Sequence, residues 1–224
     1  MSVLSTDRRA VRTRAALRDA LAAEIEAAGD LSRVTVTAVT GRAGVTRRTF
    51  YSHYRDIPDL VANVERDTID ELRPLVGALA QVRLPQLAES LDNARPCPGS
   101  VELLQSLADR PYLKALLGEG GDPAFAKRLE VMVREEVTER ALDGIDVRVV
   151  GPIFDYYLTY AISAEVGVVV RWLAGGARES AGAMARLMTA LMFVRPGDLY
   201  GKPINLDIPR FVLASVASRE VNHD

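Results

Sequence analysis

Hydrophobic residues recur at helical spacing along most of this chain. Near the amino terminus, Leu17, Leu21 and Ile25 are four residues apart, which places them on one face of a helix over residues 7–28. From Ile57 onward a longer apolar series follows the same period. No stretch alternates between apolar and polar residues for long enough to indicate a sheet. The pattern therefore predicts an all-α fold.

Capping residues mark the helix boundaries that follow the first helix. Thr35 and Thr46 each precede a short helical segment, and a threonine hydroxyl can accept a hydrogen bond from an unpaired amide of the first turn. Gly44 lies between these segments and can adopt the positive φ that ends a helix. Asp56, followed closely by Pro58, opens a fourth helix. Two short helices joined by a glycine turn, packed behind a longer first helix, predict a helix-turn-helix module.

The rest of the chain is predicted to be helical with short breaks. The expected segments are 57–74, 84–94, 101–117, 122–142, 147–174, 179–194 and a short one at 209–218 in the tail after Arg195. Pro74 is expected to kink or end its helix, and Pro111 to interrupt one. The glycine-rich residues 118–121 lack the Gly-Lys-Ser/Thr ending of a phosphate loop, which favours a hinge or surface loop.

Composition limits the class of protein. With 48% hydrophobic residues, 26% charged residues and a mean hydropathy of +0.04, the chain has the profile of an ordinary globular protein. Its most apolar stretch, residues 161–174, is short and contains Glu165 and Arg171, so it is not expected to span a bilayer. The first residues do not resemble a signal peptide. We therefore expect a cytoplasmic protein.

The few cysteine and histidine residues argue against redox and metal chemistry. Cys97 is the single cysteine, which excludes an intramolecular disulfide and a cysteine metal cluster and leaves a redox-sensing thiol as its alternative role. His53 and His223 are far apart in the sequence, which argues against a histidine zinc site. We expect no metal and no cofactor.

Charge is distributed unevenly along the chain. Residues 1–55 carry a net charge of +5, whereas the remainder carries −7. A basic quarter on an acidic body indicates a polyanionic partner at one end. The alternative is an arginine-rich helix that is simply solvated.

One segment carries a family signature. Residues 35–56 read Thr-Val-Thr-Ala-Val-Thr-Gly-Arg-Ala-Gly-Val-Thr-Arg-Arg-Thr-Phe-Tyr-Ser-His-Tyr-Arg-Asp, and Asp59-Leu60 follow. The Ala-Gly-Val turn, the Thr-Phe-Tyr of the next helix and the His-Tyr after it resemble the DNA-binding signature of the TetR family of transcriptional regulators. The resemblance covers about the first sixty residues closely, and the rest in helical layout alone. It implies a DNA-binding domain over residues 1–55 and a helical regulatory and dimerisation domain over residues 56–224.

The residue types in this segment fit the reading of DNA bases. A helix in the major groove needs side chains in its exposed first turn that reach base edges. Arg47 and Arg48 qualify, because a guanidinium can donate two parallel hydrogen bonds to guanine. Thr49 can form a hydroxyl hydrogen bond or contact a thymine methyl group. Phe50 and Tyr54 are expected to be buried and to hold the helix in place.

Other polar groups of the segment suit phosphate oxygens, which position a protein on DNA. The predicted set is Thr35, Thr37, Tyr51, His53 and Arg55, with Thr46 at the start of the recognition helix completing the DNA-binding residues. By resemblance, Thr37, Tyr51 and His53 match positions that commonly hold the DNA backbone. Packing between helices is the alternative for the tyrosine and histidine rings, and a salt bridge within the module is the alternative for Arg42.

One position departs from the family pattern. Many relatives begin the fourth helix with a lysine, and Ile57 stands at the matching position. The missing phosphate contact would fall to Arg55 or to a basic arm. The arm consists of Arg8, Arg9, Arg12 and Arg14, which would reach the minor groove or flanking phosphates.

The resemblance also implies a homodimer on a pseudo-palindromic operator, since one module buries little surface on DNA. In the family, the last two long helices of each chain form a four-helix dimer interface. The candidate interface residues here are Tyr160, Val169, Trp172, Met184, Leu187, Met188 and Leu191. Burial in the core is the alternative for each.

A small, partly apolar ligand held between the helices of the larger domain is implied as well. The candidate lining residues are Leu103, Leu107, Tyr112, Leu116, Phe125, Met132, Phe154 and Tyr157, with core packing as their alternative. A ligand that favours a conformation with wrongly spaced recognition helices would lower operator affinity by its differential binding. The expected function is that of a regulator, most simply a repressor, which leaves its operator when it binds the ligand.

Two other functions are the alternatives to this one. An interaction protein that acts through a protein partner would not need the Arg47-Arg48-Thr49 sequence or the local positive charge. An enzyme would need a nucleophile with its base, or metal-ligand spacing, and the sequence contains neither pattern. The sequence therefore predicts a DNA-binding regulator without enzymatic activity.

Overall fold

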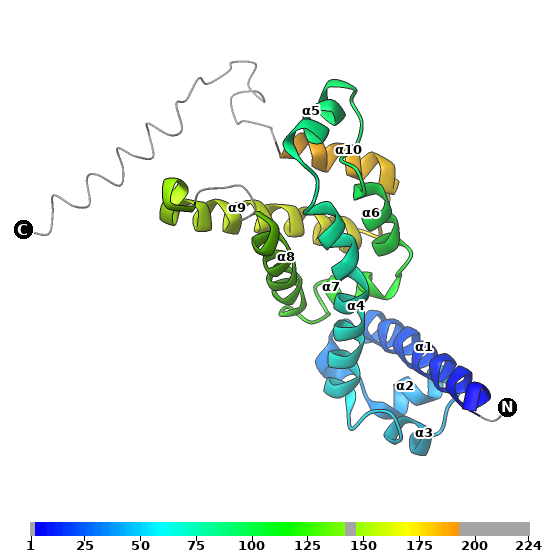
Figure 1. Cartoon of the computed structure of the whole chain (residues 1–224). Coiled ribbons are helices and arrows are strands. Elements are labelled where there is room, and N and C mark those ends of the chain that lie inside the picture. The colour runs from blue at the N-terminus through cyan, green and yellow to red at the C-terminus, as the bar shows by residue number, and fades with distance from the viewer. Residues whose placement is uncertain (1–2, 142–146, 193–224) are drawn as a thin grey trace, which may run out of the picture.

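The computed structural model describes residues 3–141 and 147–192, and these residues form α-helices and one 3-10 helix, with no strand among them (Figure 1). The predicted all-α fold is confirmed. The helices are α1 (Val3–Ala28), η1 (Leu31–Arg33), α2 (Val36–Ala43), α3 (Arg47–Tyr51), α4 (Ile57–Leu79), α5 (Leu84–Asp92), α6 (Ser100–Ala108), α7 (Tyr112–Leu117), α8 (Phe125–Ala141), α9 (Val147–Ala174) and α10 (Ala181–Leu191).

Most helix boundaries agree with the sequence pattern to within a few residues. Pro74 is an exception, because α4 neither ends there nor soon after but continues to Leu79. Pro74 lies on an exposed side of α4, where water can bind the carbonyl group of Asp70 that loses its intrahelical donor. The short helix expected at 209–218 lies outside the described residues.

The helices form two regions joined by α4. In Figure 1, α1, α2 and α3 lie together at the lower end of the molecule, and α4 runs upward from them. At the far end α6 packs against α10, while α8 packs against both α4 and α9. No helix in the described part of the chain is long and apolar enough to cross a membrane.

A single cluster of buried apolar side chains runs through both regions. In the lower region, formed by α1 to α3, the cluster contains Leu17 and Phe50. In the upper region, formed by the helices after α4, it contains Leu104 and Phe125. Leu60, near the start of α4, belongs to the same cluster. The core is therefore continuous across the boundary at residue 55.

The two regions also meet through polar and backbone contacts. The Arg18 guanidinium of α1 lies 4.5 Å from the ring centroid of Tyr112, at the start of α7. The Tyr112 hydroxyl forms a hydrogen bond of 2.9 Å with the hydroxyl of Thr68 in α4. These contacts hold the first helix against the upper region.

The glycine-rich residues 118–121 lie at this junction. The Leu31 amide donates a hydrogen bond of 2.7 Å to the Gly120 carbonyl oxygen. A Cβ atom on Gly120 would lie only 2.5 Å from the Gly29 carbonyl oxygen, so the two backbones approach too closely for any side chain. The predicted loop is thus a tight backbone contact between the regions.

Candidate functional site

The helix-turn-helix is fixed by hydrogen bonds at its helix ends. The Thr35 hydroxyl accepts a hydrogen bond of 3.2 Å from the Ala38 amide, which confirms the first predicted N-cap. The Thr46 hydroxyl accepts one of 3.1 Å from the Thr49 amide, which confirms the second. Between them, Gly44 ends α2 with a φ of +66°, a conformation that glycine adopts at little cost.

Arg47 and Arg48 occupy the first turn of α3, and both side chains are exposed. The Arg47 guanidinium donates a hydrogen bond to the hydroxyl of Thr37 on α2. The Thr49 side chain is half-buried, and its hydroxyl lies 2.9 Å from that of Thr46. The structure thus brings the predicted base-reading arginines and a predicted phosphate contact to one exposed surface.

The end of α3 presents further predicted DNA contacts. Tyr51 is 57% exposed and makes an edge contact with the Phe50 ring, with the centroids 5.5 Å apart. His53 is half-buried, whereas Arg55 is exposed and its guanidinium lies 3.4 Å from an Asp59 carboxylate oxygen. A hydrogen bond from the Arg55 amide lowers the pKa of Asp59. Arg55 therefore has an anionic partner within its own chain.

Buried aromatic rings anchor α3, the predicted recognition helix. Phe50 is fully buried, and Tyr54 is 6% exposed, which confirms its predicted place in the core. Burial raises the pKa of the Tyr54 hydroxyl. Arg42 forms an ion pair of 2.6 Å with Glu24 of α1, as the salt-bridge alternative predicted. Packing and charge thus hold α2 and α3 against α1.

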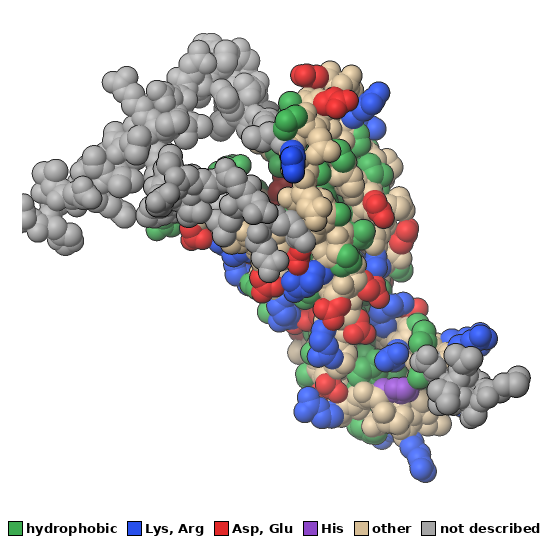
Figure 2. Space-filling model, viewed as in Figure 1, with side chains coloured by type: hydrophobic (Ala, Val, Ile, Leu, Met, Phe, Trp, Pro, Cys, Tyr) green, Lys and Arg blue, Asp and Glu red, His purple; other side chains and the backbone are tan. Residues whose placement is uncertain are grey.

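The predicted basic arm is part of a helix. Arg8, Arg9, Arg12 and Arg14 are exposed residues of α1 rather than of an extended segment. Figure 2 shows Lys and Arg side chains projecting from the lower end of the molecule, the region of α1 to α3. The positive charge inferred from the sequence therefore lies close to the recognition helix.

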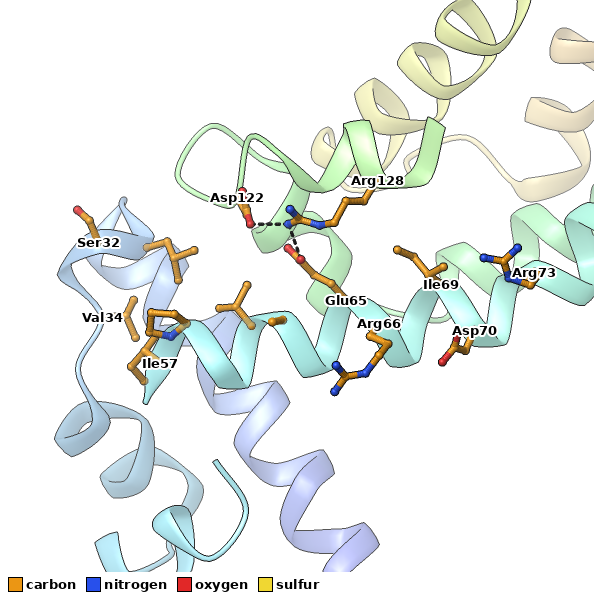
Figure 3. Close-up of a pocket in the computed structure, with 14 residues that line it drawn as sticks. Ser32, Val34, Ile57, Glu65, Arg66, Ile69, Asp70, Arg73, Asp122 and Arg128 are labelled. Atoms are coloured by element: carbon orange, nitrogen blue, oxygen red, sulfur yellow. Dashed lines mark hydrogen bonds and ion pairs between the residues drawn. The ribbon is translucent and has the colours of Figure 1, made fainter. Parts of the chain in front are cut away.

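A cavity of about 660 Å³ lies at the junction of the two regions (Figure 3). Its apolar walls come from η1, from the start and middle of α4, and from the segment between them. They include Leu31, Val34, Ile57, Val61 and Ile69. Ile57, which replaces the lysine of many relatives, is buried and forms part of this wall. The departure from the family pattern thus has a structural role.

A buried group of charged side chains borders this cavity. Glu65 of α4 is 3% exposed, and one of its oxygens accepts a hydrogen bond from the Arg128 guanidinium. The same guanidinium nitrogen donates to Asp122 at 2.6 Å (Figure 3). Within the described part of the chain, Oε1 of Glu65 and Nε of Arg128 are buried without a hydrogen-bond partner.

Burial decides the ionisation of Glu65. It raises the pKa of Glu65 to about 7, although the Arg128 guanidinium opposes this and the Asp122 carboxylate adds to it. Burial would raise the pKa of Asp122 as well, but hydrogen bonds from the Ala124 amide and from Arg128 lower it overall. Asp122 is therefore the more acidic carboxyl of the pair.

The sequence interpretation did not single out Glu65, although its position carried a signal. It lies four residues after Val61 and three before Thr68, within the apolar stripe of α4. An acidic residue on the buried face of a helix requires a cationic or hydrogen-bonding partner, or else its pKa is raised. Its partner Arg128 is 63 residues away, so the sequence could not identify it.

The candidate ligand-lining residues lie elsewhere. Leu107, Tyr112, Leu116, Phe125 and Met132 are buried in the core, and Leu103 is half-buried against it. Tyr157 is 59% exposed, and the side chain of Phe154 lies outside the described residues. None of the described residues in this set borders the junction cavity.

The candidate interface residues separate into two groups. Trp172 and Met184 are buried within the chain, and the Trp172 indole donates a hydrogen bond of 3.1 Å to the Glu179 carbonyl oxygen. Val169 and Met188 are half-buried. Among the described side chains of α9 and α10, the large exposed apolar ones are Tyr156, Tyr157, Tyr160, Leu187 and Leu191, with Met192 just after α10.

Cys97 is buried beside α10. Its amide donates a hydrogen bond of 2.8 Å to the Thr189 hydroxyl, and burial raises the pKa of its thiol. A buried thiol that resists ionisation is a poor redox sensor, since the thiolate is the reactive form. Among the described residues, no three His, Cys, Asp or Glu side chains are grouped to hold a metal ion.

Comparison with known proteins assigns the larger region. A family model for the transcriptional regulator C-terminal region of the TetR type matches residues 98–193, which include α6 to α10. No curated protein sequence matches the chain. The matched segment lies outside residues 35–60, where the signature was found, so two separate parts of the chain point to the same family. The chain belongs to the TetR family of transcriptional regulators.

Proposed function

We propose that this regulator binds a pseudo-palindromic operator as a homodimer and acts as a repressor. The observation that carries the proposal is the pair of exposed guanidinium groups, Arg47 and Arg48, in the first turn of a helix anchored by the buried Phe50. This is the arrangement that major-groove recognition requires. Thr35, Thr37, Tyr51 and the helical arginines of α1 are the proposed phosphate contacts, and such a regulator would act in the cytoplasm.

The proposed dimer interface is the exposed apolar surface of α9 and α10. Tyr156 and Tyr160 are each more than 70% exposed, which is unusual for large aromatic side chains unless another molecule covers them. Aromatic and methionine side chains are enriched at protein interfaces. Two-fold pairing through this surface would carry two recognition helices to successive turns of the major groove.

Release from the operator is proposed to follow the binding of a small molecule. Such a ligand acts only through its differential affinity for the DNA-bound and free conformations. The packed residues predicted from the sequence, such as Leu107 and Phe125, would have to move to admit it between the upper helices. The junction cavity needs no such movement.

A DNA-selection experiment tests the proposal. The full chain is incubated with random duplexes at moderate salt, beside the double variant Arg47→Ala, Arg48→Ala. The matched control is Arg83→Ala, Arg95→Ala, which removes the same charge from exposed positions around α5. We expect the parent and the control to enrich one pseudo-palindrome and the α3 variant to enrich none. If no sequence is enriched and all three proteins behave alike, the proposal is wrong. The alternative function, in which the chain acts through a protein partner, then takes its place.

A further inference from the structure

We infer that the junction cavity is a binding site for a small amphipathic cation, an amine with an apolar body, whose ammonium group pairs with Glu65. Binding of the amine itself requires no DNA. Only the regulatory consequence of that binding rests on the proposed function. The site is separate from the core residues of the larger region and from the exposed surface of α9 and α10.

One carboxylate oxygen at the polar end of the cavity lacks a hydrogen-bond donor. Glu65 is 3% exposed, yet its Oε1 atom has no partner among the described residues (Figure 3). Leaving a buried carboxylate oxygen unpaired is costly, and the cost is recovered when a donor binds there. A ligand that carries N–H groups would supply that donor.

The charge balance favours a cationic donor. One guanidinium nitrogen of Arg128 serves two carboxylates, Glu65 and Asp122, so the group carries one negative charge in excess when both are ionised. Two further arginines and one further acid border the cavity: Arg66 donates to the neutral amide oxygen of Asn63, Arg73 pairs with glutamates of α8, and Asp70 is exposed on α4. Figure 3 shows both arginines turned away from Glu65. An ammonium group would neutralise the excess.

The remainder of the cavity suits an apolar body. A volume of about 660 Å³ exceeds what a metal or inorganic ion needs and matches small-molecule sites. Leu31, Val34 and Ile57 line one end, and Val61 and Ile69 line the floor along α4. The lining also includes the charged side chains of Arg66, Asp70 and Arg73, but Glu65 is its one buried carboxylate among the described residues, so a head group bound there would fix the orientation of the ligand.

A ligand in this cavity would touch both regions of the chain. Leu31 and Ile57 flank the helix-turn-helix, whereas Asp122 and Arg128 belong to the upper region. Any change in their separation would alter the cavity. Given the proposed function, the amine would therefore bind the DNA-bound and free conformations with different affinity, which is the requirement for an effector.

The test uses three probes with one naphthalene body: naphthylethylamine, naphthylethanol and naphthylacetate. Their binding to the full chain is measured by calorimetry at about pH 8, where the carboxylates are ionised. We expect the amine to bind at least about tenfold more tightly than the alcohol, and the carboxylate most weakly, as for a hydrogen bond to a charged group. Equal binding of amine and alcohol, preference for the carboxylate, or no binding would each overturn the inference.

Variants locate the site. Glu65→Gln keeps the shape of the side chain and should abolish the preference for amine over alcohol, whereas Glu89→Gln, at an exposed position of α5, should retain it. Ala62 is an exposed residue of α4 that borders the cavity, so Ala62→Phe should fill the space without disturbing the core. We expect it to weaken amine binding at least about tenfold. Unchanged amine binding in folded Ala62→Phe would overturn the inference.

Operator binding is measured separately, with the Arg47→Ala, Arg48→Ala variant included. Amine binding that survives in this variant while DNA binding is lost supports the site independently of the recognition helix. A parent protein that binds operator but no amine would overturn the inference and leave the proposed function intact. Amine binding without any operator binding would support the site and contradict the proposed function.

Discussion

Neighbouring side chains of the recognition helix have different roles. Arg47 and Arg48 are exposed, while Phe50, two residues later, is fully buried. A five-residue helix has too few internal hydrogen bonds to be stable alone, so its geometry depends on that anchor. Substitutions of neighbouring residues should therefore have separable effects on DNA affinity and on stability.

Arg48→Ala should weaken operator binding by about 1–3 kcal/mol, because a guanidinium that reads guanine contributes this much discrimination. The free energy of unfolding should not change, since the side chain is exposed. Titration of labelled operator DNA measures the first quantity and urea denaturation the second. Equal affinity of Arg48→Ala and the parent would exclude Arg48 as a base contact.

Phe50→Ala should lower the free energy of unfolding by about 3–5 kcal/mol, because it removes a large, fully buried side chain. Tyr51→Ala is the matched control, since the adjacent ring is 57% exposed and its removal should change stability little. Both are measured by urea denaturation. A similar loss in the two variants would contradict the assigned anchor.

The raised pKa of Glu65 predicts how the stability of the protein depends on pH. This pKa is raised to about 7 from 4.5, so the folded state binds this proton more tightly than the unfolded state. The free energy of unfolding should therefore fall as the pH rises between these values. Burial raises the pKa of Glu165 to about 7 as well, so it adds a similar fall.

Glu65→Gln should remove on the order of 3 kcal/mol of that fall and leave the part due to Glu165. Urea denaturation at several pH values measures the change, with Glu89→Gln as the control. The same pH dependence in Glu65→Gln and the parent would show that Glu65 does not titrate in this range.

At the scale of helices and loops, the sequence predicted those features that depend on interactions between residues close together in the chain, such as helix caps. Thr35 and Thr46 cap their helices because the atoms that they bind lie three residues away. The contact between Leu31 and Gly120 joins residues far apart in the sequence, so only folding brings them together. For the same reason, the glycine-rich loop was recognised but its role at the junction was not.

Gly120→Ala tests that contact. The new Cβ atom would lie 2.5 Å from a backbone oxygen, so one backbone must move, at an expected cost of about 1–3 kcal/mol. Gly41→Ala, inside α2, has no atom within 4 Å of the added Cβ and should be neutral or slightly stabilising. Thermal unfolding compares them. Equal stability of the two variants would mean that the junction tolerates a side chain.

At the scale of the whole molecule, the exposed surface of α9 and α10 determines the expected assembly. Tyr160→Glu places a charge on a side chain that is 75% exposed, so it should leave the fold intact and convert the proposed dimer to a monomer. Val11→Glu, at an exposed apolar position of α1, should remain dimeric. Sedimentation velocity measures both. A dimeric Tyr160→Glu would place the interface elsewhere.

The continuous core has a consequence for cooperativity. Buried side chains from Leu17 to Ala185 belong to one cluster, and α1 packs against α7. Residues 1–55 expressed alone would therefore lose packing partners and be unable to fold into a stable unit. Heating the full chain should accordingly give one calorimetric transition, in which the recognition helix melts together with the larger region rather than before it.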